Sequence, residues 1–138
     1  MIPDLDPKSP VPLYLQIVEQ VRRLLALGVL KPGERFLTVR ELGARARVNR
    51  NTAARAIGEM ERSGLVRTRV GQGTYIADDP PAIEASRRDA ALDAAIEKLL
   101  IEAHALGVHS EELGWRIHRK LEEFSRTRRG RDDGKEPR

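Results

Sequence analysis

Cysteine is absent from the 138-residue sequence, so the chain forms no disulfide and offers no thiolate ligand to a metal. Aromatic residues make up only 4% of the sequence, which argues against a large all-β core. The apolar runs are short and interrupted, whereas a membrane-spanning helix needs about 20 consecutive apolar residues. The first ten residues, MIPDLDPKSP, are acidic and proline-rich and lack the apolar stretch of a secretory signal. The sequence therefore predicts a cytoplasmic protein of one or two small domains.

Positive charge is concentrated in the first part of the chain. The net charge is +4, and residues 1–79 carry all of it, because residues 80–138 hold equal numbers of basic and acidic side chains. Every basic residue between positions 35 and 69 is an arginine, whose planar guanidinium suits phosphates and guanine edges. The charge alone leaves two readings open, a nucleic-acid-binding surface and a merely solvated basic face.

Three helices are predicted in the first half of the chain from apolar residues that recur at helical spacing. They cover residues 12–28, 39–46 and 50–63. Thr38 and Glu41 form a capping box at the start of the second helix, and Asn49 is a suitable N-cap for the third. Arg47 and Val48 leave room for only a tight turn between these two helices.

A hairpin is predicted after the third helix, because the apolar period changes to that of strands. The strands cover residues 65–69 and 74–77, and a glycine-rich turn at 70–73 joins them. Two short helices, a tight turn and a glycine-tipped hairpin are typical of a winged helix-turn-helix, whose second helix enters the major groove of DNA. We predict this domain over residues 1–79, since Asp78-Asp79-Pro80-Pro81 interrupts any regular structure.

The second half of the chain predicts two further helices, over residues 83–106 and 110–126. Residues 127–138 are rich in Arg, Gly, Asp and Pro, so we expect a disordered basic tail there. The predicted fold class is mainly α with a small β-wing: an N-terminal winged helix-turn-helix followed by a two-helix C-terminal unit over residues 80–126.

Several motifs, in order and at the expected spacing, resemble the GntR family of bacterial transcription regulators. They are PLY at 12–14, GERFLTVREL at 33–42, VNRNTAARA at 48–56, GLV at 64–66 and GQGTYI at 71–76. The short C-terminal part and the LGVHSEEL stretch at 106–113 resemble the YtrA subfamily, in which two C-terminal helices serve dimerisation. The sequence departs from the family at Leu37, where proline is usual, and at Ala54, where several branches place a DNA-contacting arginine.

The resemblance implies a sequence-specific repressor that binds a palindromic operator in double-stranded DNA as a homodimer. The predicted DNA-binding residues lie on the second helix, at the start of the third helix and on the wing: Arg40, Asn49, Arg50, Asn51, Thr52, Arg55, Arg69, Gly71, Gln72 and Gly73. Each has a structural alternative. Arg40 could instead be an exposed helix residue paired with Glu41 or another acid, Asn51 could be an exposed polar filler, and any tight hairpin favours Gly71 and Gly73.

The predicted dimer interface lies on the two C-terminal helices. It comprises Leu92, Ile96, Leu99, Leu100, Leu113, Trp115, Ile117, Leu121 and Phe124. The alternative is that this apolar face folds back onto the first helix of the same chain.

No constellation in the sequence supports catalysis, and we expect no enzyme activity, no cofactor and no metal. His104, His109 and His118 lack the spacing of a metal site. The short tail predicts no dedicated effector pocket, although a small molecule acting between the two units is left open. The competing function is a winged-helix protein-interaction module without sequence-specific DNA binding.

Overall fold

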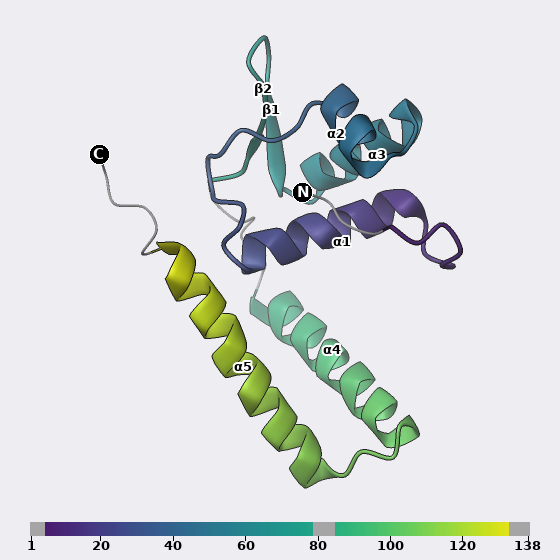
Figure 1. Cartoon of the computed structure of the whole chain (residues 1–138), viewed down its shortest axis with the longest axis vertical. Helices are drawn as coiled ribbons and strands as arrows, with labels where there is room; N and C mark the ends of the chain where they lie inside the picture. Colours follow the sequence, from purple (N-terminus) through teal and green to yellow (C-terminus); the bar gives the residue numbers. More distant parts are fainter. Residues whose placement is uncertain (1–4, 79–84, 133–138) are drawn as a thin grey trace. The chain divides into compact units, whose positions relative to one another are not determined.

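The computed structural model describes residues 5–78 and 85–132 (Figure 1). The elements in chain order are α1 (Leu13–Ala26), α2 (Val39–Ala46), α3 (Arg50–Arg62), β1 (Val66–Arg69), β2 (Gly73–Ile76), α4 (Ala85–Ala105) and α5 (Ser110–Asp132). The chain divides into two compact units, residues 1–81 and 82–138. The predicted boundary after residue 79 lies outside the described residues. Among those that are described, no helix combines the length and the apolar character that crossing a membrane requires.

The first unit is organised around α3, which packs against α1, α2 and β1 (Figure 1). The apolar residues predicted to face inward from α3, namely Ala53, Ala56, Ile57 and Met60, are all buried. They meet Ile17, Val18 and Val21 of α1, Leu42 of α2, and Val66 and Ile76 of the hairpin. The three helices therefore enclose one core, and the prediction of a winged helix-turn-helix is confirmed.

The helix bounds in this unit agree with the prediction to within the uncertainty of helix ends. The hairpin is antiparallel, with Val66 opposite Ile76 and Arg69 opposite Gly73. Residues 33–36, for which the sequence predicts no strand, also pair with β2. The Phe36 N–H donates to the Thr74 carbonyl at 2.7 Å, and the Ile76 N–H donates to the Glu34 carbonyl at 2.8 Å. β2 is therefore paired on both edges, with β1 and with residues 33–36.

The turn between α2 and α3 is tight because of its backbone geometry. Arg47 closes α2 in the left-handed region at φ 54°, and the Val48 N–H donates to the Gly43 carbonyl at 3.1 Å. A Cβ on Gly43 would lie 3.3 Å from the Val48 carbonyl oxygen, which is closer than most such contacts. Gly43 thus allows α3 to start close against α2.

The second unit consists of α4 and α5, joined by a loop at residues 106–109 (Figure 1). The expected disorder from residue 127 is wrong for residues 127–132, because α5 continues to Asp132. Arginine is a good helix former and is favoured near a helix C-terminus, so the polar composition of this stretch does not prevent a helix. In addition, the Thr127 hydroxyl donates to the Glu123 carbonyl at 3.0 Å. Residues 133–138 lie outside the described part of the chain.

The hairpin offers a matched test of the core. Val66 is 1% exposed and Val70 is 100% exposed. We expect Val66→Ala to lower the free energy of unfolding by about 1.5–3 kcal/mol, because it removes buried methyl groups and leaves a cavity. Val70→Ala should change it by less than about 0.5 kcal/mol. Urea unfolding of both variants measures the difference, and equal effects would contradict the described register.

Candidate nucleic-acid interface

Side-chain caps fix the starts of both helices of the helix-turn-helix. The Glu41 N–H donates to Thr38 Oγ1 at 3.2 Å, and the Thr38 hydroxyl donates to Glu41 Oε1 at 3.1 Å. The Thr52 N–H donates to Asn49 Oδ1 at 2.8 Å. Both caps confirm the sequence prediction, and they determine which residues begin the two helices.

Arg40 and Arg50 lie on a shared groove between α2 and α3. The groove has a volume of about 450 Å³, and its lining residues are Val39, Arg40, Gly43, Ala44, Val48 and Arg50. Both arginines are exposed, and Val39, Ala44 and Val48 supply the apolar part of the lining. The structure therefore brings together two cations that are ten positions apart in the sequence, beside a small apolar surface.

The alternative for Arg40 is an ion pair with Glu41, and the structure, which describes both residues, does not show this pair. Glu41 instead accepts from Thr38 and lies 3.9 Å from the Arg35 guanidinium. Residues 35–69, the arginine-rich segment, contain two other acidic side chains, and both have polar partners. Glu59 pairs with Arg62 at 3.1 Å, and Glu61 accepts from Thr68.

Arg40 and Arg50 consequently keep their charge uncompensated by the side chains that the structure describes. Within residues 5–78 and 85–132, neither Arg40 nor Arg50 has an acidic partner within ion-pair distance. Arg50 also stands in the first turn of α3, where the helix dipole disfavours a cation. A surface of this kind is suited to an anion.

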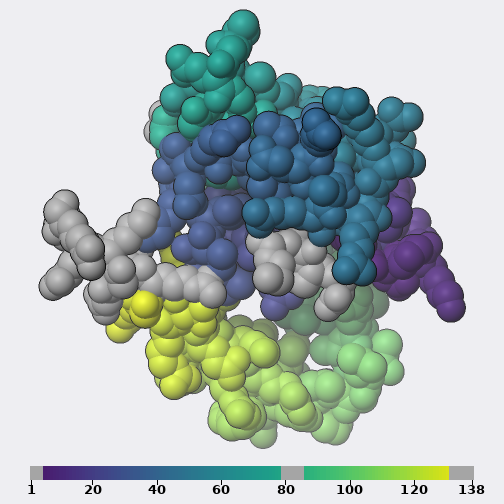
Figure 2. All heavy atoms as spheres, turned by 45° about the horizontal axis from the view of Figure 1, so that its top comes forward, coloured from purple at the N-terminus to yellow at the C-terminus, as the bar shows by residue number. Residues whose placement is uncertain are grey.

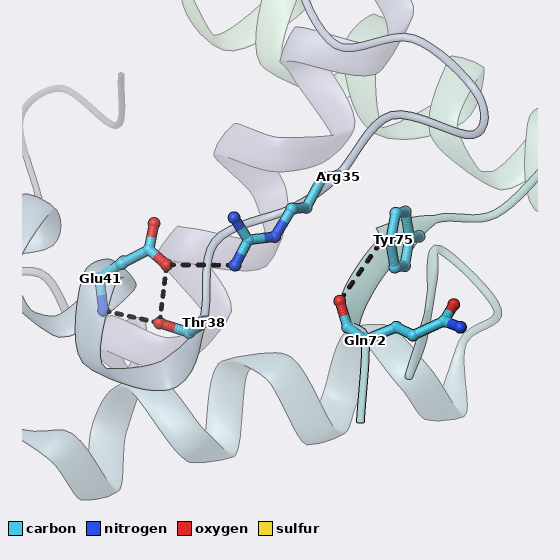
Figure 3. A network of polar contacts seen from close by, with 5 residues as sticks. All are labelled: Arg35, Thr38, Glu41, Gln72 and Tyr75. Atoms are coloured by element: carbon cyan, nitrogen blue, oxygen red, sulfur yellow. Dashed lines mark hydrogen bonds and ion pairs between the residues drawn. The ribbon is translucent and has the colours of Figure 1, made fainter. Parts of the chain in front are cut away.

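The wing is preorganised by Tyr75. Its hydroxyl donates to the Gln72 carbonyl at 3.2 Å (Figure 3). The centroid of its ring lies 4.5 Å from the Arg69 guanidinium carbon. The Gln72 N–H donates to the Arg69 carbonyl at 2.9 Å and closes the turn. Gly71 and Gly73 have φ of 74° and 102°, a region that side chains disfavour. The backbone conformation of the turn thus explains these glycines by itself, with or without a ligand at the wing.

Arg35 connects the wing to the helix-turn-helix and was missed by the sequence analysis. Its backbone bridges to Tyr75, and its guanidinium points toward Glu41 at the start of α2 (Figure 3). The only available signal was its membership of the arginine-rich segment, which does not distinguish it from its neighbours.

The predicted DNA-binding residues all belong to the first unit, on α2, at the start of α3 and on the wing. Most are exposed, and only Thr52 and Gly73 are half-buried. Figure 2 shows α2 and α3 in blue beside the teal wing on one face. Arg55 also lies on α3, but its guanidinium stacks on Tyr14 of α1, with 4.2 Å between the Arg55 guanidinium carbon and the ring centroid.

Among the described residues, His104, His109 and His118 belong to no group of side chains that could bind a metal ion. His118 lies 3.3 Å from Glu122 one turn along α5, which is an ordinary pair on a helix surface. In the part of the chain that the structure describes, no three His, Asp or Glu side chains gather in a way that could hold a metal ion.

Comparison with known proteins agrees with the resemblance seen in the sequence motifs. Residues 13–76 match the family model of "Bacterial regulatory proteins, gntR family". The chain is 34% identical to the HTH-type transcriptional repressor YtrA of Bacillus subtilis, over 91% of this chain and 94% of that protein.

Two solved structures from Listeria monocytogenes are also similar. One is described as a transcriptional antiterminator (33% identity, TM-score 0.70, 88% of both chains). The other is a GntR family transcriptional regulator (30% identity, TM-score 0.64, 83% of this chain and 98% of that one). Since the similarity extends beyond residues 13–76, it includes the C-terminal helices.

The two asparagines at the start of α3 provide a test of the cap. Asn49→Ala should lower the free energy of unfolding by about 1 kcal/mol, because the Thr52 N–H loses its acceptor. The Asn51 side chain makes no hydrogen bond within the part of the chain that the structure describes. The free energy of unfolding of Asn51→Ala should therefore stay within about 0.5 kcal/mol of the parent value. Thermal unfolding of the two variants makes the comparison. A larger loss for Asn51→Ala than for Asn49→Ala would contradict the described cap.

Proposed function

The chain belongs to the GntR family of bacterial regulatory proteins, and from this premise we propose that it represses transcription by binding a specific operator in double-stranded DNA as a homodimer. The observation that carries the proposal is the groove between α2 and α3. Arg40 and Arg50 line it, and neither has an acidic partner among the residues that the structure describes. The proposal places the protein in the cytoplasm and assigns it no catalytic role.

In the proposed complex the start of α3 enters the major groove, as in other helix-turn-helix proteins. Arg40 and Arg50 are then within reach of guanine edges and phosphates, which the guanidinium fork binds in a bidentate manner. Asn51 suits an adenine edge, and Thr52 suits a phosphate. The apolar lining of the groove between them suits a thymine methyl group.

The wing supplies the second contact in this proposal. Tyr75 restrains both Arg69 and the Gln72 backbone, so that the turn loses little conformational freedom on binding. A tip made of Gly71 and Gly73 is narrow, which suits the minor groove, with Arg69 and Gln72 at its edges. An arginine there is attracted by the negative potential of a narrow minor groove.

The second unit supports dimerisation because it has almost no core of its own. Among its described side chains only Ala103 is buried. Eight of the nine residues predicted for the interface are exposed in the single chain, and Leu113 is half-buried. Each large apolar side chain left in water forgoes about 1.5–3 kcal/mol of burial free energy. A second copy related by a two-fold axis would cover these surfaces.

The protein-interaction alternative is disfavoured by the exposed surface of α3. A helix that binds a protein partner usually exposes apolar anchors. The exposed residues of α3 are instead Arg50, Asn51, Ala54, Arg55, Gly58, Glu61 and Arg62, among which no large apolar side chain occurs. This composition supports a polar, anionic ligand.

Two arginines at opposite ends of α3 test the DNA contact. We expect Arg50→Ala to weaken operator binding by about 1–3 kcal/mol if Arg50 contacts a base. If Arg50 contacts a phosphate, the variant should lower the salt slope, which is the steepness with which the logarithm of the binding constant falls with the logarithm of salt concentration, by about one. Arg62→Ala is the control, because Arg62 lies at the far end of α3 and pairs with Glu59. Binding is measured by fluorescence anisotropy over a salt series. An unchanged affinity and salt slope for Arg50→Ala would exclude both contacts.

The dimer is tested at Leu121, which is 61% exposed in the single chain. Leu121→Asp should yield a folded monomer at micromolar concentration with much weaker operator binding, because a carboxylate would be buried at the interface. Leu121→Met retains the apolar contact and should remain dimeric. Sedimentation velocity gives the oligomeric state, and circular dichroism confirms the helices. A monomeric parent chain would rule out the proposed interface, and operators selected from random DNA without dyad symmetry would count against a two-fold arrangement.

A further inference from the structure

A second groove on α3 is distinct from the one that Arg40 and Arg50 share. It lies between the starts of α1 and α3 and has a volume of about 330 Å³. Its lining includes Pro12, which precedes α1, Leu13 and Tyr14 from α1, and Asn51, Thr52 and Arg55 from α3. Arg50 lines the groove shared with α2, whereas Arg55 lines the one shared with α1. Arg50 and Arg55 of α3 therefore line different grooves.

The guanidinium of Arg55 is held in this groove by an aromatic ring. Its carbon atom lies 4.2 Å from the centroid of the Tyr14 ring, which is the geometry of a cation–π contact. Tyr14 is half-buried and packs against the core formed by α1, α2 and α3, so the ring has a fixed position. An arginine on a fixed ring has lost much of its rotamer freedom before any ligand binds.

Stacking also leaves the donors of Arg55 available. The ring occupies one face of the guanidinium, whereas the N–H groups point outward in the guanidinium plane. Arg55 has no carboxylate within ion-pair distance among the described residues. Thr52 lines the same groove, and its hydroxyl adds a neutral donor. One cation and a neutral donor in a concave site match a singly charged phosphodiester.

We propose that the groove between α1 and α3 binds a phosphodiester of the DNA backbone, and that Tyr14 is a positioning residue that holds Arg55 for this contact. The proposal rests on the DNA-binding function proposed above and adds α1 to the elements at the interface. It assigns Arg55 to the backbone and leaves base recognition to Arg40, Arg50 and Asn51. Contacts of this kind set the register of a protein on DNA without reading its sequence.

The test is a double-mutant cycle on the full-length protein. The variants are Tyr14→Phe, Tyr14→Leu, Arg55→Ala and the double variant Tyr14→Leu/Arg55→Ala, with Arg62→Ala as the control for a removed arginine. Each is titrated into a fluorescent duplex carrying the selected operator and into a scrambled duplex of the same length and composition. Thermal unfolding checks that each variant folds, and Tyr14→Leu retains the apolar packing of the ring.

We expect Arg55→Ala to weaken binding to both duplexes by the same factor, about tenfold at low salt, and to lower the salt slope by about one. Tyr14→Leu should weaken binding about threefold when Arg55 is present, through the lost cation–π contact, and should have no effect in the Arg55→Ala background. Tyr14→Phe should bind as the parent does, because the ring rather than the hydroxyl holds the guanidinium.

Three results would overturn the inference. A loss confined to the operator, with relaxed preference at one base pair, would make Arg55 a base-reading residue. Equal effects of Tyr14→Leu in both backgrounds would remove the positioning role of Tyr14. An effect of Tyr14→Phe as large as that of Tyr14→Leu would assign the contact to the hydroxyl. If the parent protein preferred no selected duplex, the proposed function would fail instead, while the scrambled duplex would still report the phosphate contact.

Discussion

The burial of one face of α3 is the constraint on which the rest of the first unit depends. Ala53 and Ala56 are completely buried, and their small side chains allow neighbouring elements to approach α3 closely. Because that face is occupied by the core, the polar residues of α3 must face outward. The groove shared with α2 and the groove shared with α1 are consequences of this single packing arrangement, since each lies where a neighbouring helix meets the exposed surface of α3.

The electrostatics of the interface depend on where the acidic side chains are engaged. Glu41, Glu59 and Glu61 each have a polar partner away from the groove that Arg40 and Arg50 share. Glu41 is especially informative, because it is adjacent to Arg40 in sequence yet contacts Thr38 and Arg35. Exposed ion pairs contribute little stability, so this arrangement matters mainly for the field that it leaves at the surface. The charge of Arg40 and Arg50 remains available to a ligand.

The sequence predicts local features of this protein well and contacts between distant segments poorly. The starts of α2 and α3 follow from Thr38 and Asn49, because a cap involves only residues within one turn. The pairing of residues 33–36 with β2 is too short to show an alternating pattern, and the stack of Arg55 on Tyr14 joins two helices. The sequence names Arg40, Arg50 and Arg55 as candidates alike. Only the packing separates the first two, which share one groove, from the third.

The first unit exposes an arginine-lined groove and the second exposes large apolar side chains, and this difference has a consequence for how the proposed regulator reaches its affinity. One winged helix has few phosphate and base contacts, so its binding to DNA is expected to be weak and sensitive to salt. Joining two such domains through α4 and α5 makes the second binding event intramolecular and raises its effective concentration. The apolar side chains of the second unit then affect operator occupancy without touching DNA. Any ligand that changed the stability of the proposed dimer would alter DNA binding by the same linkage, even though no separate effector domain is required.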